Sequence, residues 1–258
     1  MPFRIIKTVW DYCAYSKKYL AFILILLFIS GLIQNEFHRS LHSFEWFVFQ
    51  IIVLIPVNGY GMVITRDRIN HGIRLPKLII KDILIFGIKS TIVFSVYWTI
   101  QGFVLGLVCF PLDFPIFELE DIFMDFNNTM HLIHTHNPVH FAIYIIAGAI
   151  LFYITTFFLE IALAKLADTN SIKEAFNFSS IKKSIDAIGW INYTKEYTMI
   201  ILAIVILSYI DNFVVFVPVI DGVLGLILGL LIFATQFMGI GAVYRDMKDN
   251  ERKGIKLE

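Results

Sequence analysis

The sequence predicts an all-α fold: a polytopic integral membrane bundle of six transmembrane helices with about three amphipathic helices on the cytoplasmic surface. Of the 258 residues, 58% are hydrophobic and 16% are charged, with a mean hydropathy of +0.75, whereas soluble domains carry about 25% charged residues. Long apolar stretches recur along the chain, and the cations are confined to alternate segments between them. No linker or low-complexity tract interrupts residues 1–258, so we expect a single transmembrane domain.

The spans follow from length and hydropathy. A helix rises about 1.5 Å per residue and the hydrocarbon layer is about 30 Å thick, so a crossing needs about 20 mostly apolar residues. The expected spans are residues 19–34, 44–64, 90–110, 141–165, 197–219 and 222–244. The apolar run 78–110 is too long for one crossing, and Lys81, Asp82 and Lys89 would be costly inside the bilayer. We therefore expect residues 77–89 to lie along the surface and the third crossing to begin near Ser90.

Each odd-numbered span follows a cationic stretch with helical periodicity. In the first, Phe3, Ile6 and Trp10 fall on one face, and in the third Ile181, Ile185 and Ile188 do so. The middle stretch, 77–89, is less cleanly divided. The cations expected to contact the lipid surface are Arg4, Lys7, Lys81, Lys89, Lys182 and Lys183.

Orientation follows from the cations. Every Lys and Arg except Arg39 lies before the first span, between the second and third, between the fourth and fifth, or after the sixth. The positive-inside rule places these segments, and hence both termini, in the cytoplasm. A formal net charge of zero argues against a nucleic-acid partner.

A short pattern recurs where the even-numbered spans end. A basic residue stands close to an aspartate in Thr65-Arg66-Asp67, in Lys165-Leu-Ala-Asp168 and in Tyr244-Arg245-Asp246. Three repeated units, each a surface helix followed by a membrane hairpin, would produce this pattern. The general preference for cations at the cytoplasmic headgroups would produce it too.

Several of these residues also resemble a known family. Gly59-Tyr60 through Arg66, Gly72, Leu75-Pro76-Lys77 and the segment 164–176 are similar to an uncharacterised membrane family, a domain of unknown function common in methanogenic archaea. The resemblance covers roughly residue 59 to the C-terminus. It implies an archaeal plasma membrane location, and it supplies no catalytic or binding residue.

The outer loop, residues 111–140, is acidic and contains histidines but no Lys or Arg. Its histidines have a spacing that could ligate zinc or another divalent metal, with Asp121 or Asp125 completing the shell. These histidines are His131, His134, His136 and His140. The alternative is a solvated acidic loop that topology keeps free of cations. No other cofactor is expected.

Polar residues inside the spans are the next candidates, because such groups are costly in lipid and usually face a cavity or another helix. They are Gln50, Gln101, Glu160, Asp211, Asn212 and Gln236. They could line a solute pathway around Asp211, or form hydrogen bonds between helices. The pairs Gly102/Gly106 and Gly225/Gly229 could pack helices within the chain, against a second copy, or against another membrane protein.

No motif of an enzyme is present: the chain has no His-Glu-x-x-His and no Gly-x-Ser-x-Gly. We therefore expect a non-catalytic membrane scaffold or accessory subunit whose basic amphipathic helices adhere to the cytoplasmic leaflet. Two alternatives remain. One is a transporter or channel for a small solute or ion, and the other is an extracytoplasmic metal-binding protein or metalloenzyme that uses the loop histidines.

Overall fold

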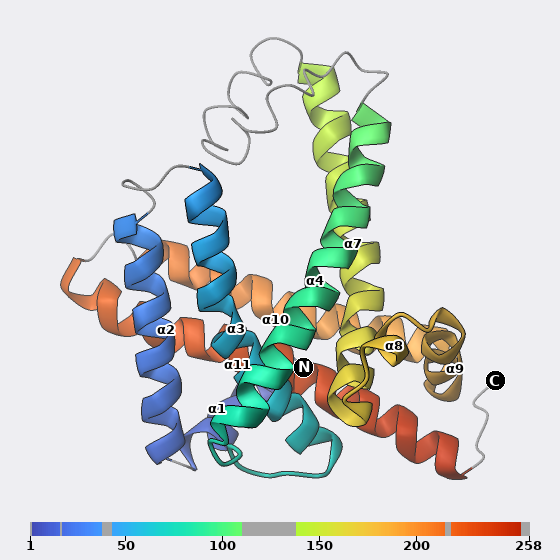
Figure 1. Ribbon diagram of the computed structural model, residues 1–258, viewed down its shortest axis with the longest axis horizontal. Helices are drawn as coiled ribbons and strands as arrows, with labels where there is room; N and C mark the ends of the chain where they lie inside the picture. The colour runs from blue at the N-terminus through green and yellow to red at the C-terminus, as the bar shows by residue number, and fades with distance from the viewer. Residues whose placement is uncertain (1, 16, 38–42, 110–137, 215–217, 254–258) are drawn as a thin grey trace.

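The computed structural model describes residues 2–15, 17–37, 43–109, 138–214 and 218–253. Within these ranges it places the side chains of residues 6–15, 19–29, 52–108, 139, 142–210 and 224–252. All regular secondary structure in this part of the chain is helical, which confirms the all-α prediction (Figure 1). The helices are α1 (Pro2–Ala14), α2 (Lys17–Phe37), α3 (Ser43–Ile69), α4 (Ile80–Cys109), α7 (Pro138–Thr169), α8 (Ile172–Ala175), α9 (Phe178–Ile188), α10 (Trp190–Val214) and α11 (Pro218–Lys253).

Four segments of the described residues are long and apolar enough to cross a membrane. They are Ile80–Val108, Ala142–Thr169, Trp190–Ile210 and Leu224–Arg252. A fifth is possible if Ile6–Ala14 and Tyr19–Ile29, which are bent by 110° at the break between them, count as one span. The chain is thus a helical protein with at least four segments suited to a bilayer.

One expected boundary differs from the structure. The stretch 77–89 was predicted to be a separate surface helix, but α4 runs without a break from Ile80 to Cys109. Two contacts explain the continuity. The Ser90 hydroxyl donates to the carbonyl of Gly87 within the helix, and the Lys89 ammonium donates to the Asn170 carbonyl at 2.7 Å and to Asn170 Oδ1 at 2.8 Å. The Lys89 charge therefore has partners at the end of α7, so the helix does not need to bend there.

The centre of the fold consists of the three helices that carry the recurring basic-acidic pattern. Helices α3 and α7 both pack on α11 and on each other, while α4 packs against α3 and α7. The Thr65 hydroxyl of α3 donates to the Phe237 carbonyl of α11 at 3.0 Å, inside the core. In Figure 1, α4 and α7 form a tall hairpin, and the hairpin of α10 and α11 runs across it.

Helices α3 and α4 approach each other closely at two glycines. A Cβ added to Gly59 would overlap the carbonyl of Ile83, and one added to Gly87 would overlap the carbonyl of Ile55. By contrast, nothing lies within 4 Å of a Cβ added to Gly102, Gly106 or Gly229. The prediction that these three glycines pack helices within the chain is therefore wrong for the described residues, and packing against a partner stays a prediction.

Helix α9 has the facing that its sequence predicts. Ile181, Ile185 and Ile188 are buried, while Lys182 and Lys183 are exposed. The N-cap is Asn177, whose side-chain oxygen accepts from the Ser180 amide at 3.1 Å. This contact satisfies one of the backbone donors that a helix start leaves free.

The glycine contact between α3 and α4 gives a testable prediction. Gly59→Ala should lower the free energy of unfolding by about 1–3 kcal/mol, because the methyl group forces two helix backbones apart. Gly102→Ala is the matched control. There the methyl group meets open space, and the higher helix propensity of alanine should give a gain of up to about 1 kcal/mol. Thermal unfolding in detergent measures both, and equal midpoints for the two variants would contradict the packing.

Candidate functional site

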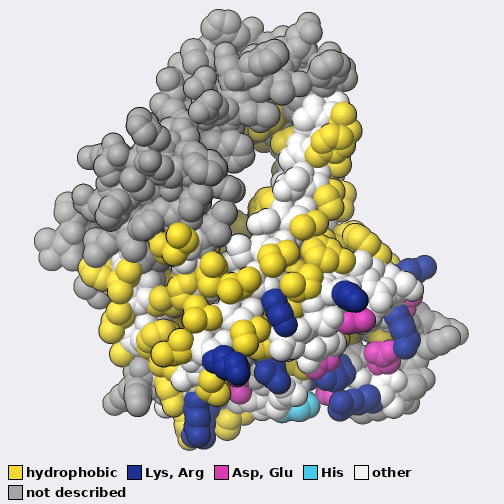
Figure 2. Space-filling model, in the orientation of Figure 1, with side chains coloured by type: hydrophobic (Ala, Val, Ile, Leu, Met, Phe, Trp, Pro, Cys, Tyr) yellow, Lys and Arg dark blue, Asp and Glu magenta, His cyan; other side chains and the backbone are white. Residues whose placement is uncertain are grey.

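Charged side chains gather where α3, α7 and α11 end. Figure 2 shows the Lys and Arg side chains in the lower part of the molecule, with the Asp and Glu side chains among them and apolar side chains above. We call this region the charged base and define it by Asp67, Arg68, Lys165, Asp168, Arg245 and Lys248. The recurring pattern of the sequence therefore marks helix ends that converge in space.

Helices α7 and α11 are joined by an ion pair in the charged base. The Lys248 ammonium lies 2.6 Å from Asp168 Oδ1, and the two side chains are 27% and 18% exposed. The Lys165 ammonium donates to the Ser180 hydroxyl of α9 at 2.8 Å and lies over the Tyr244 ring of α11. A more exposed pair, Lys183 with Glu251, joins α9 to the end of α11. These contacts join α7, α9 and α11 at the charged base.

Helices α1 and α3 meet at a second cluster in the charged base. The Tyr12 hydroxyl donates to Asp67 Oδ2 at 2.8 Å, and the Arg68 guanidinium lies over the Tyr12 ring, 5.5 Å from its centre. Burial raises the pKa of Asp67, and the hydrogen bond from Tyr12 and the nearby Arg68 oppose that shift. A Cβ at Gly72 would overlap the Asp67 carboxylate, so a larger residue there would displace that side chain from its place beside Tyr12.

Arg68 is held at two points and still has donors free. Its Nη1 donates to the Gly72 carbonyl at 2.6 Å, while its Nε is buried without a hydrogen-bond partner. Among the described residues, no ion pair involves Arg68. Burial lowers the pKa of Arg68, but a guanidinium is so strong a base that it remains cationic.

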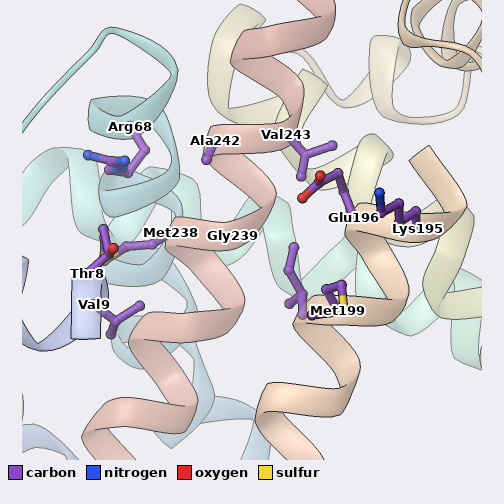
Figure 3. Close-up of a pocket in the computed structure, with 11 residues that line it drawn as sticks. Thr8, Val9, Arg68, Lys195, Glu196, Met199, Met238, Gly239, Ala242 and Val243 are labelled. Carbon is purple, nitrogen blue, oxygen red and sulfur yellow. The ribbon is translucent and has the colours of Figure 1, made fainter. Parts of the chain in front are cut away.

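Next to Arg68 lies a pocket of about 270 Å³ between α1, α3, α10 and α11. Figure 3 shows Arg68 on one side of Ala242 and Gly239, and Lys195 and Glu196 on the other. The Glu196 side chain extends from α10 toward α11 (Figure 3). Sequence reasoning missed this pocket, because no spacing along the chain relates Arg68 to residues at the start of α10.

The polar residues predicted inside the spans do not form one set. Glu160 of α7 forms a hydrogen bond with Gln236 of α11, and its Oε2 is buried without a partner. Gln101 lies near the other end of the α4–α7 hairpin, and its Oε1 is also buried without a partner. The side chains of Gln50, Asp211 and Asn212 lie outside the described ones. The structure thus brings together Glu160 and Gln236, and it separates Gln101 from them.

The predicted metal site cannot be compared with the structure, because Asp125 and the side chains of His131, His134, His136 and His140 lie outside the described residues. Within the described part of the chain, no group of three or more His, Cys, Asp or Glu side chains could hold a metal ion. Divalent metal binding by the loop stays a prediction.

The cations predicted to contact lipid fall into two groups. Lys7, Lys81, Lys182 and Lys183 are exposed, and the last of these pairs with Glu251. Lys89 instead donates to Asn170 within the protein. The Arg4 side chain lies outside the described ones.

The helices, their apolar lengths and the charged base define the class: an all-helical protein with the features of a membrane protein. The chain belongs to the family described as "Protein of unknown function (DUF4013)", which matches residues 45–233. This membership agrees with the resemblance that the sequence carries. No curated protein and no solved structure matches the chain.

Glu160 gives a prediction for the core. An ionised carboxylate without a cation beside it is costly in an apolar interior. Glu160→Gln keeps a hydrogen-bonding group for Gln236 and removes the ionisable one, so the midpoint of thermal unfolding should stay unchanged or rise. Asp168→Asn is the matched control on the same helix. It neutralises a carboxylate that has a cation partner, so it should lower the midpoint. A lower midpoint for Glu160→Gln than for Asp168→Asn would contradict this account.

Proposed function

We propose that the protein is a non-catalytic, multi-pass membrane scaffold or accessory subunit of the plasma membrane, with its charged base against the anionic cytoplasmic leaflet and both termini in the cytoplasm. The observation that carries the proposal is the division of the surface. Charged side chains gather at one end, while exposed apolar side chains cover the helices beyond it (Figure 2).

The apolar part of the surface supports contact with lipid. On α4, Phe103 is 68% exposed and Leu107 is 58% exposed, and on α7, Ile146 is 60% exposed and Ile150 is 54% exposed. A soluble monomer rarely exposes apolar patches of this extent. In hydrocarbon the same side chains need no protein partner.

The charged part of the surface supports contact with lipid headgroups. Lys81, Lys173 and Lys182 are exposed, and among the described residues no ion pair involves them. An anionic leaflet attracts each such cation by about 1 kcal/mol at low salt. The apolar face of α9 packs in the protein core, so its opposite face, which carries Lys182 and Lys183, is the one available to headgroups.

The proposed topology has six crossings, which are the helices α2, α3, α4, α7, α10 and α11. It rests on the positive-inside distribution, because only an even number of crossings places every cationic segment on one side. Since α10 and α11 run across the α4–α7 hairpin (Figure 1), they would cross the bilayer at a larger tilt than α4 and α7.

The scaffold proposal predicts that the exposed lysines outside the ion pairs of the described residues recruit anionic lipid. Protein reconstituted into vesicles of phosphatidylcholine with a minor share of phosphatidylglycerol should be enriched in phosphatidylglycerol when it is extracted in polymer-bounded discs and the lipids are quantified. Replacing Lys81, Lys173 and Lys182 together by Gln should abolish most of the enrichment, since each cation contributes up to about fivefold at low salt.

The triple replacement of the same lysines by Arg is the matched control, because it keeps the charges. It should retain the enrichment, and high salt should weaken that enrichment in both the control and the wild type. Equal lipid ratios for the Gln and Arg variants would contradict the proposal.

One observation favours a second function, the transport of a proton or small cation. Glu160 is a buried carboxyl with a free oxygen, next to a small cavity lined by Tyr193 and Tyr197. Intramembrane carboxyls often carry ions. Glu160→Gln would then abolish ion flux into proteoliposomes while it leaves the fold intact, whereas a scaffold would show no flux with either residue.

A further inference from the structure

The pocket beside Arg68 combines an apolar part with a charged part. Its apolar part contains Val9 of α1, Met199 and Ile200 of α10, and Met238 of α11. Gly239 and Ala242 are the smallest residues of the lining, and on α11 they lie between Arg68 on one side and Glu196 on the other (Figure 3). An occupant of this pocket would have to be amphipathic.

The charged part contains two cations and one carboxylate, Arg68, Lys195 and Glu196. Among the described residues, no ion pair engages any of these three. Their formal sum is one positive charge, which matches the single negative charge of a phosphodiester. Arginine and lysine are the side chains that proteins use for phosphate oxygens.

Glu196 adds a requirement to the ligand, because a carboxylate repels a phosphate and accepts hydrogen bonds from donors. A second, more polar pocket of about 450 Å³ shares Lys195, Glu196, Ala242 and Val243 with the first. Its other lining residues are Ile188, two amides and two carboxylates: Asn192, Asn250, Asp246 and Asp249. A head group that extends beyond its phosphate would enter this space with its hydroxyls beside Glu196.

We propose that the pocket between α1, α3, α10 and α11 binds one anionic phospholipid with a hydroxylated head group. The phosphodiester lies between Arg68 and Lys195, a head-group hydroxyl donates to Glu196, and the acyl chain begins along Val9, Met199 and Met238. Basic pockets between membrane helices on the cytoplasmic side bind anionic head groups in this way. The inference rests on the proposed position of the charged base at the cytoplasmic leaflet.

Native mass spectrometry of the full-length protein in detergent tests the site with two lipids of equal charge. Phosphatidylglycerol carries head-group hydroxyls, and phosphatidylmethanol carries none. The first phosphatidylglycerol should bind about tenfold more tightly than the first phosphatidylmethanol, the factor that one hydrogen bond to a charged group gives. Glu196→Gln should reduce this preference. Lys195→Gln should lower the affinity for both lipids by about tenfold.

Two controls separate the pocket from general surface charge. Arg66 lies two residues before Arg68 on α3, is exposed and does not line the pocket. Arg68→Gln should therefore weaken binding of the first lipid far more than Arg66→Gln does. Because Arg68 also contacts Gly72 and Tyr12, its loss could unfold the turn, so Lys195→Gln is compared with the exposed Lys182→Gln as a second pair. Equal weakening within both pairs would overturn the proposal.

The source of the phosphate is tested with sn-glycerol 3-phosphate. The soluble compound should compete at least a hundredfold more weakly than the lipid, since it makes no contact with the apolar lining. Equal competition would overturn the lipid assignment. The two proposals also fail separately. The pocket fails if Lys195→Gln and Glu196→Gln bind phosphatidylglycerol as the wild type does, whereas the scaffold proposal fails if the three-lysine Gln variant keeps its lipid enrichment.

Discussion

The cost of placing a charge in hydrocarbon organises this molecule. A charged side chain at the centre of a membrane helix costs about 2.5–3.5 kcal/mol on insertion scales, and the chain carries 42 formally charged residues, 21 of each sign. Its long apolar helices remain free of most of these charges because the charges collect where α3, α7 and α11 end. There they find partners in one another, as Lys248 and Asp168 do, or in polar groups, as Lys165 does in Ser180.

A hydrocarbon environment also determines how the helices pack against one another. Hydrocarbon surrounds apolar side chains as well as a protein core does, so burial of apolar surface gives little drive for helix association in a bilayer. Van der Waals contacts between closely packed backbones stabilise the association instead. The backbones of α3 and α4 make such contacts at Gly59 and Gly87. Buried hydrogen bonds add to these contacts. The Thr65 hydroxyl reaches the carbonyl of Phe237, and the Tyr193 hydroxyl reaches the carbonyl of Phe157 at 2.6 Å.

Those features of the fold that depend on local periodicity could be predicted from the sequence. The helical class and the buried face of α9 follow from the spacing of apolar and charged residues. The continuity of α4 could not, because it depends on Asn170, a residue 81 positions from Lys89 that becomes its partner only in three dimensions. The prediction that Gly102, Gly106 and Gly229 pack helices within the chain was wrong for a similar reason. The small-xxx-small spacing of Gly102 and Gly106 is permissive, and only the partner helix decides which glycines come into contact.

The pocket beside Arg68 could not be predicted from the sequence. Arg68 follows the Thr65-Arg66-Asp67 pattern and reads as one more headgroup cation, but burial against Tyr12 and Gly72 separates it from exposed neighbours such as Arg66. Lys195 and Glu196 have no pattern that relates them to Arg68. Four helices distant in sequence create the pocket, so its chemistry became visible only once their packing was known.

Crosslinking in oriented membranes tests the central claim, that the ends of α7 and α11 meet in one charged base on the cytoplasmic side. Asp168 and Lys248 would be replaced by cysteine in a chain whose Cys13 and Cys109 are serine, and a short membrane-impermeant bis-maleimide would be added to vesicles of each orientation. The account predicts a crosslink between positions 168 and 248 in inside-out vesicles and none in right-side-out vesicles. A crosslink in right-side-out vesicles, or in neither preparation, would contradict it.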